Sequence, residues 1–133
     1  MLLGEYQPSI DSKHRFALPK NLRDAIRGNQ IIITKGFEEC ILGYAKDDWE
    51  AEAFKYLESP ISDPHSRHLK QYLYSGASES SLDDQGRFVI PANLADYAEI
   101  DEAIIVIGAG DHFEIWEPKK WAEHLAEIEA EVR

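Results

Sequence analysis

Two arginines and two aspartates occur at the same spacing. Asp11 is followed by Arg15 and Asp83 by Arg87, and each arginine precedes an apolar stretch that ends in proline. The guanidinium group is a planar fork of donors that can grip a guanine edge or a phosphate, whereas a carboxylate is a poor DNA ligand and a good turn cap. These residue types make the arginines candidates for nucleic-acid contact and favour a structural role for the aspartates. An ion pair that only braces each turn is the alternative.

The surroundings of the two arginines differ. Basic side chains flank the first one, and the candidates for phosphate or base contact there are Lys13, His14, Lys20 and Arg23. The second arginine follows Asp84 and Gln85. Gln85 is a further candidate contact, but the carboxylate of Asp84 repels phosphate. We therefore expect Arg15 to dominate DNA binding and Arg87 to be auxiliary.

The charge of the chain is uneven. The formal net charge is -11, which argues against a polyanion partner because Lys and Arg provide the affinity for phosphates. Residues 1–35 nevertheless carry six basic and three acidic side chains, whereas residues 76–133 carry four basic and 14 acidic ones. A nucleic acid is therefore expected to dock on the N-terminal segment, although a merely solvated surface would also produce this asymmetry.

An internal repeat organises the chain. Sliding the sequence by 72 positions aligns its two halves without a gap. The identical pairs include Gly4/Gly76, Asp11/Asp83, Arg15/Arg87, Phe16/Phe88, Pro19/Pro91, Leu22/Leu94, Gly36/Gly108 and Trp49/Trp121. The chain is therefore a duplication.

Each half predicts the same ββαββα unit. A strand (6–10 or 77–82) meets the polar turn DSKH or DDQG, and a second strand follows to form a hairpin. Proline then precedes a short helix (NLRDAI or NLADYA), and two further strands, IIITKG and ILGYA or AIIVIG and FEIWE, lead to a closing amphipathic helix. These elements must position the two arginines at the ends of two turns.

A helix is expected to connect the halves. Asp63 is suited to be an N-cap and Pro64 to be the first helical residue, and Leu69, Tyr72 and Leu73 provide an apolar stripe. We predict a first repeat over 1–58, a linking helix over 59–75 and a second repeat over 76–133.

The strings GEYQPSIDSKHRFALPKNLR, SLDDQGRFVIPANLADYA and GDHFEIWEPKKW resemble the MraZ family of bacterial transcriptional regulators. The resemblance covers essentially the whole chain. It implies an α+β, pseudo-dimeric fold in which the two units exchange hairpins into one AbrB-like β-barrel with peripheral helices. It also implies a cytoplasmic, nucleoid-associated regulator that binds repeats in double-stranded DNA at the promoter of its own division and cell-wall gene cluster. The family further implies a homo-oligomeric ring.

One residue departs from the family pattern. The fourth position of the turn is glycine in the second copy, Gly86, but histidine in the first, His14. If this position has a positive φ, a non-glycine residue costs about 1 kcal/mol or more.

Other chemistry finds little support in the sequence. Asp63, His65 and His68 lack a third placed metal ligand, and we predict no metal, no cofactor, no small-molecule substrate and no enzymatic activity. Cys40 is expected to be a small buried residue, and no apolar run has the roughly 20 residues that a membrane span needs. The aromatic side chains Tyr44, Trp49 and Trp121 are expected in the core, and Glu114 and Glu117 at a strand-to-helix junction.

The competing interpretation is a protein-interaction module of the MazE antitoxin class. That class is expected to carry a disordered toxin-binding tail, whereas the last residues here predict an amphipathic helix. The DNA-binding regulator is therefore the leading hypothesis.

Overall fold

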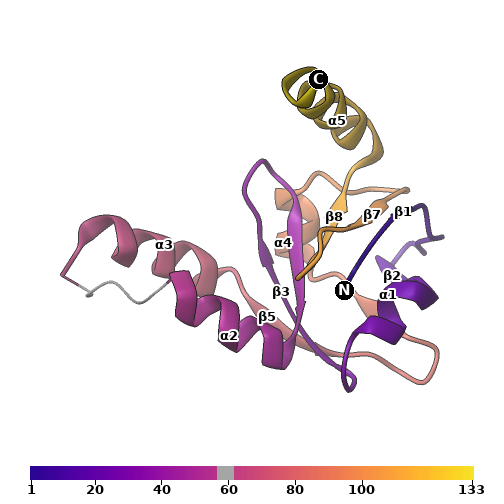
Figure 1. The fold of residues 1–133 in the computed structure, drawn as a ribbon. Coiled ribbons are helices and arrows are strands. Elements are labelled where there is room, and N and C mark those ends of the chain that lie inside the picture. Colours follow the sequence, from indigo (N-terminus) through magenta and orange to yellow (C-terminus); the bar gives the residue numbers. More distant parts are fainter. Residues whose placement is uncertain (57–61) are drawn as a thin grey trace.

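The computed structural model describes residues 1–56 and 62–133, which form an α+β fold (Figure 1). The first copy comprises β1 (Glu5–Tyr6), β2 (Arg15–Ala17), α1 (Lys20–Ala25), β3 (Gln30–Lys35), β4 (Ile41–Ala45) and α2 (Lys46–Tyr56). After α3 (Pro64–Ser75), the second copy comprises β5 (Ser78–Ser81), β6 (Arg87–Val89), α4 (Ala92–Tyr97), β7 (Ile105–Gly108), β8 (Phe113–Trp116) and α5 (Pro118–Val132). The predicted order ββαββα therefore occurs twice.

The helix starts follow from the residues that precede them. Pro19 and Pro91 stand before α1 and α4 with φ of -52° and -57°. Asp63 caps α3 by accepting from the Ser66 N–H, as predicted, and Glu117 caps α5 by accepting from the backbone N–H groups of Lys119 and Lys120. The predicted linking helix thus begins at Pro64. Its predicted start at 59, and the boundary of the first repeat at 58, lie outside the described residues.

The main sheet is built by exchange between the two copies. Its strand order is β1-β7-β8-β4-β3-β5. The first strand of each copy pairs with the third strand of the other, β1 with β7 and β5 with β3. Each copy therefore completes the sheet of the other.

The predicted hairpins are present only as turns. The strand before each turn was expected to pair with the strand after it, but the ladder is limited to one bridge between Ile10 and Phe16 in the first copy. Instead β2 pairs with β6 in a separate antiparallel ribbon. The reason is that this pairing satisfies the backbone groups of both short strands and brings Phe16 and Phe88 together, with ring centroids 4.9 Å apart.

The single closed barrel that the family resemblance implied is not confirmed. Over the described residues, the strands form an open six-stranded sheet and the separate two-stranded ribbon. The exchange of strands between copies is observed, whereas the closure of all strands into one barrel is not. The division into 1–58, 59–75 and 76–133 stays a prediction.

Two hydrophobic clusters lie on opposite faces of the main sheet. Alternate residues of β3 separate them, because Ile31 and Ile33 belong to one cluster and Ile32 to the other. The first cluster joins the sheet to the ribbon, α1 and α4, and includes Phe16, Phe88, Leu22 and Leu94. The second joins it to α2, α3 and α5, and includes Tyr44, Trp49, Leu73 and Trp116. The ribbon and the helices α2, α3 and α5 therefore lie on opposite sides of the sheet.

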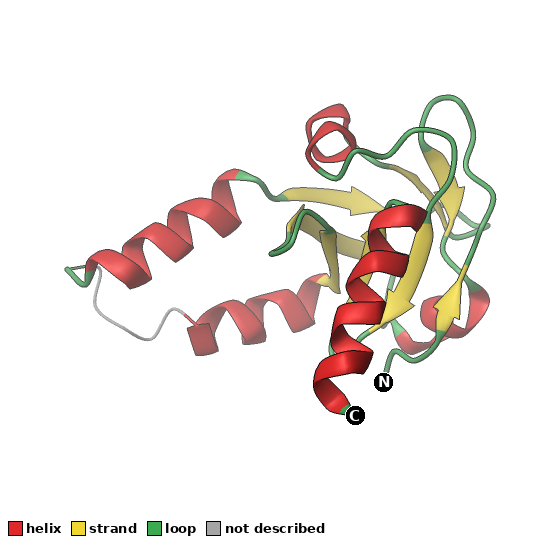
Figure 2. Ribbon diagram, turned by 90° about the horizontal axis from the view of Figure 1, so that it is seen from above, coloured by secondary structure: helices red, strands yellow, loops and turns green. Residues whose placement is uncertain are grey.

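The outer helices are only partly packed. Helices α2 and α3 lie side by side and project from one end of the sheet (Figures 1 and 2). Helix α5 has no buried residue, and Val132 near its end is 79% exposed. Within the described parts of the chain, no helix is long and apolar enough to cross a membrane.

Candidate nucleic-acid interface

The β2–β6 ribbon brings the two predicted arginines onto one surface. Its register pairs Arg15 with Val89 and Ala17 with Arg87. Because side chains alternate along a strand, both arginines point away from the buried Phe16. Arg15 and Arg87 are diagonal neighbours on this face of the ribbon. Residues in this relation in an antiparallel ladder lie roughly 7–8 Å apart. The two copies therefore contribute to a single two-stranded element rather than to two separate hairpins.

Each turn is held by its aspartate. Asp11 Oδ1 accepts from the backbone N–H groups of Lys13 and Arg15 at 2.9 Å each. In the second copy, Asp83 accepts in the same way from Gln85 and Arg87, also at 2.9 Å. The backbone N–H groups of Arg15 and Arg87 are the main cause that lowers the pKa of these two carboxyl groups. Both aspartates therefore have the geometry of turn caps.

The two arginines differ in how tightly they are held. The Nε of Arg87 donates to Asp83 at 2.9 Å, whereas the Nε of Arg15 lies 3.5 Å from Asp11. The side chain of Arg15 is 47% exposed and that of Arg87 is 39% exposed. The guanidinium of Arg15 is thus the more available of the two for an external ligand.

The fourth turn position has positive φ in both copies, at 62° for His14 and 74° for Gly86. The departure at His14 therefore places a non-glycine residue in a left-handed conformation. Both positions also link the copies, because the His14 carbonyl accepts from Ile90 N–H and the Gly86 carbonyl from Leu18 N–H, each at 2.9 Å. The turns and the ribbon are one hydrogen-bonded unit.

Arg23 connects α1 of the first copy to the turn of the second. Its Nη1 donates to the Gln85 carbonyl at 2.6 Å. A Cβ atom at Gly86 would lie only 2.3 Å from the Arg23 Cδ, so the arginine covers this glycine. The equivalent of Arg23 in the second copy is Ala95, which cannot form such a bond. Only the second turn has this brace.

The remaining candidates lie around the ribbon. Lys13 and Gln85 are exposed at the two turns. The Lys20 Nζ lies 2.8 Å from Asp24 in an exposed ion pair, which is a weak interaction that a phosphate can replace. The structure thus gathers Lys13, His14 and Arg15 at one turn and Gln85, Arg87 and Arg23 at the other, with Lys20 on α1.

A second polar cluster escaped the sequence prediction. His112 lies between Asp111 and Glu114, with distances of 2.6 Å from Nδ1 to Asp111 and 2.8 Å from Nε2 to Glu114. Glu114 also accepts from the Trp116 indole N–H at 2.9 Å. The signal that could have found this cluster is strand alternation, which places positions 112, 114 and 116 on one face.

The other residues singled out from the sequence have structural positions. Cys40 is 2% exposed, and burial raises the pKa of its thiol. Tyr44 and Trp49 are buried in the second cluster, against which Trp121 packs as a partly buried residue. Glu117 caps α5, whereas Glu114 bonds to His112. In the part of the chain that the structure describes, no group of three His, Cys, Asp or Glu residues could hold a metal ion.

The ribbon and the duplicated unit define a class of α+β protein in which two copies of one unit exchange strands within a single chain. The family profile described as "MraZ protein, putative antitoxin-like" matches the chain twice, over residues 1–72 and 73–133. The chain belongs to the MraZ family.

Relatives of similar length carry the same family name. The transcriptional regulator MraZ of Roseiflexus castenholzii is 41% identical over 130 residues, which are 98% of this chain and 90% of the relative. The transcriptional regulator MraZ of Clostridium beijerinckii is 40% identical over 124 residues, which are 93% of this chain and 87% of the relative. The transcriptional regulator MraZ of Limosilactobacillus fermentum is 38% identical over 124 residues, or 93% and 86% of the two chains.

Proposed function

We propose that this protein is a sequence-specific transcriptional regulator that binds double-stranded DNA through the β2–β6 ribbon. The observation that carries the proposal is the register of the ribbon, which presents Arg15 and Arg87 on one exposed face. A two-stranded ribbon fits the major groove, and a guanidinium can read guanine there. The names of the relatives, transcriptional regulators, support the same role.

The contacts divide by residue type. Arg15 contacts a base edge or a phosphate. Lys13, His14 and Lys20 contact phosphates of the DNA backbone and thereby fix the position of the ribbon along the duplex. Arg87 and Gln85 provide auxiliary contacts at the second turn. Arg23 was predicted to contact phosphate, and its bond to the Gln85 carbonyl supports a further role in holding that turn.

Tight binding requires several copies of the chain. The N-terminal segment has a local charge of only +3, and affinity for DNA rises with the number of neutralised phosphates. We infer a homo-oligomeric ring that presents many ribbons to successive promoter repeats in the nucleoid. Light scattering at micromolar concentration tests this inference, which a monomer with full DNA affinity would contradict.

A gel-shift assay with the DNA upstream of the protein's own gene, in the division and cell-wall cluster, tests DNA binding. We expect a specific complex that weakens steeply between about 50 and 200 mM salt, because phosphate contacts release counterions. A scrambled DNA of the same length is the control. Equal affinity for both DNAs would contradict sequence-specific binding.

A protein-interaction role of the antitoxin type is the second candidate. The apolar stripe of α5, which includes Leu125, Ile128 and Val132, favours it because the first two side chains are only half-buried and Val132 is 79% exposed. The gel-shift assay separates the two functions, since an interaction module without DNA contacts gives no specific complex.

A further inference from the structure

The outward face of the β2–β6 ribbon carries apolar side chains beside its arginines. The register of the ribbon gives two cross-strand pairs on this face, Arg15 with Val89 and Ala17 with Arg87. The phenylalanine between the two outward residues of each strand is buried on the other side, because side chains alternate along a strand. Val89 is 48% exposed although it is a large apolar side chain. An apolar group thus lies directly between the two arginines.

Arg15 and Val89 are close neighbours in the ladder. The next pair along the ribbon is hydrogen-bonded, because the Ile90 N–H donates to the His14 carbonyl at 2.9 Å. Hydrogen-bonded and non-hydrogen-bonded pairs alternate in an antiparallel ladder, so Arg15 and Val89 form a non-hydrogen-bonded pair. Side chains lie closest together in such pairs, whose Cα atoms are about 4.5 Å apart. A ligand that contacts Arg15 therefore also lies near Val89.

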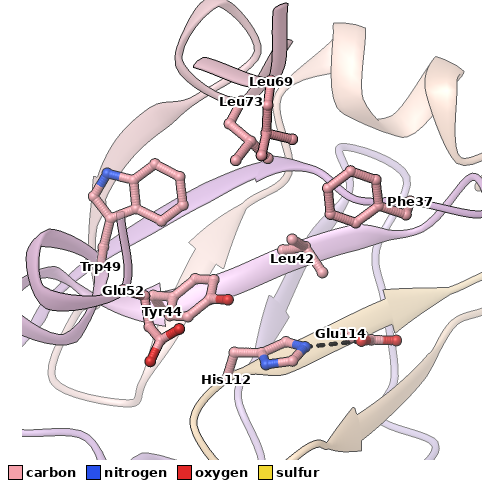
Figure 3. Close-up of a pocket in the computed structure, with 9 residues that line it drawn as sticks. All are labelled: Phe37, Leu42, Tyr44, Trp49, Glu52, Leu69, Leu73, His112 and Glu114. Atoms are coloured by element: carbon pink, nitrogen blue, oxygen red, sulfur yellow. Dashed lines mark hydrogen bonds and ion pairs between the residues drawn. The ribbon is translucent and has the colours of Figure 1, made fainter. Parts of the chain in front are cut away.

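The surroundings of Val89 differ from those of the other exposed apolar side chains. Phe37 lines a pocket of about 220 Å³ on the opposite face of the main sheet, together with Leu42 and Tyr44 of the second hydrophobic cluster (Figure 3). Val132 lies near the end of α5. Val89 instead lies among arginines that are paired with aspartates, and an apolar protein surface would have to bury these charged groups. A partner that combines hydrogen-bond acceptors with small apolar groups fits this face better.

The edge of the major groove has this composition. Guanine presents the acceptors O6 and N7 to an arginine, and thymine presents a C5-methyl group to an apolar side chain. Neighbouring base pairs are about 3.4 Å apart along the duplex, which is close to the distance between the two Cα atoms of a non-hydrogen-bonded pair. Valine is branched at Cβ and stiff, so it loses little freedom in such a contact.

We propose that Val89 contacts the C5-methyl group of a thymine in the base pair next to the one that Arg15 contacts. This inference rests on the proposed function, and it adds a residue that determines specificity without donating a hydrogen bond. The valine and the arginine come from different copies of the unit, so the strand exchange brings together the two side chains that recognise neighbouring bases.

The two copies differ at this contact. The counterpart of Val89 in the first copy is Ala17, which is exposed and lies opposite Arg87. Alanine can also touch a thymine methyl group, but its side chain is two carbon atoms smaller. The preference for thymine is therefore expected to be stronger beside the base that Arg15 contacts than beside the base that Arg87 contacts.

Uracil substitution tests the proposal, because uracil differs from thymine only by the missing C5-methyl group. The probe is the DNA upstream of the protein's own gene, in which each thymine is replaced by uracil, one position at a time. Anisotropy titrations with the full chain measure the affinities. We expect one position in each recognised repeat at which uracil weakens binding about fourfold, the factor that corresponds to the burial of one methyl-sized group.

Variants assign this effect to the side chain. Val89→Ala should bind the thymine DNA about as weakly as the unchanged protein binds the uracil DNA, and uracil should then have no further effect, because the two changes remove the same contact. Val89→Ile keeps a branched apolar side chain and should keep the preference for thymine. Val132→Ala makes the same chemical change on α5 and is the control that should change nothing. Circular dichroism checks that each variant is folded, and light scattering measures its mass.

The inference and the proposed function fail in different ways. If the thymine DNA forms no specific complex, the proposed function is wrong and the inference falls with it. If a specific complex tolerates uracil at every position, only the inference is overturned. A uracil effect that persists in Val89→Ala also overturns it, because the shape of the DNA would then explain the effect. A lower mass of Val89→Ala with an unchanged preference for thymine would assign this side chain to a protein contact instead.

Discussion

The two turns of the molecule have the same pattern and the same backbone conformation but different surroundings. At the first, His14 occupies the positive-φ position and Arg15 is loosely paired with its aspartate. At the second, Gly86 occupies that position, Arg87 is tightly paired, and Arg23 reaches across from the other copy. The two turns thus share their sequence pattern but not the side chains that surround them. The first turn is the more open to an external ligand, and the second is the more firmly braced.

The largest expected effect concerns DNA affinity. Arg15→Ala should lower specific affinity about 10- to 100-fold, because a good bidentate contact to a base contributes about 1–3 kcal/mol. Arg87→Ala should lower it less than about fivefold, since its fork is engaged with Asp83. Anisotropy titrations with both variants, each folded by circular dichroism, measure the ratio. A larger loss for Arg87→Ala would reverse the assignment of the two turns.

The brace on the second turn predicts a coupled loss of stability. Gly86→Ala should cost about 2 kcal/mol, because it adds a side chain at positive φ and displaces Arg23 from the Gln85 carbonyl. Gly28→Ala is the matched control: Gly28 also has φ of 74°, but a Cβ atom there meets nothing within 4 Å. That variant should cost only about 1 kcal/mol.

Urea unfolding in the Arg23→Ala background completes this test. Once Arg23 is removed, the cost of Gly86→Ala should fall to that of Gly28→Ala, because no side chain remains to be displaced. An unchanged cost of Gly86→Ala in that background would show that the brace does not couple to this glycine.

The first turn predicts a smaller change of opposite sign. His14→Gly should raise the free energy of unfolding by about 0.5 kcal/mol, because glycine relieves the positive φ while it loses more chain entropy on folding. The measurement is again a urea titration. A loss of stability would mean that the imidazole makes contacts that outweigh the strain.

The smallest difference is expected in acid. Both turn aspartates have a pKa below the ordinary value of 3.8, so their contribution to stability is present above that pH and is lost as the pH falls through the lowered pKa. The second turn keeps the Arg23 bond after its aspartate is protonated. As the pH is lowered, the His14 amide should therefore lose its protection against hydrogen exchange at a higher pH than the Gly86 amide. Simultaneous loss of protection would argue against a structural role of the brace.

The sequence predicted the elements better than their partners. Proline and N-cap signals, together with apolar periodicity for the closing helices, located the helices of the described residues, and the 72-residue repeat gave the order ββαββα. The exchange of strands was not predictable from the residues, because β5 has the sequence SESS and β1 spans two residues, so neither has the apolar alternation that specifies a register. The family resemblance implied that the two copies exchange hairpins within one closed barrel. The structure instead shows an exchange of single strands in an open sheet.

The candidate site shows the same limit. The arginines and their aspartates were found because they recur at fixed spacing. Arg23 and Gln85 are 62 positions apart, and their contact depends on the strand exchange, so no local pattern could predict it. The available signal was the mismatch between Arg23 and its counterpart Ala95, which indicates a role that only one copy needs.

The strand exchange also determines what mutation can do to this protein. In a dimer of identical chains, every substitution appears on both sides of the symmetry axis. Here a covalent chain holds the two copies together, so their pairing does not depend on dilution and each copy can mutate alone. His14, which corresponds to Gly86, and Arg23, which corresponds to Ala95, are positions at which only one copy has changed. Joining the two copies in one chain has therefore released the β2–β6 ribbon from palindromic symmetry, and under the proposed function the DNA sequence that it recognises is free to be asymmetric as well.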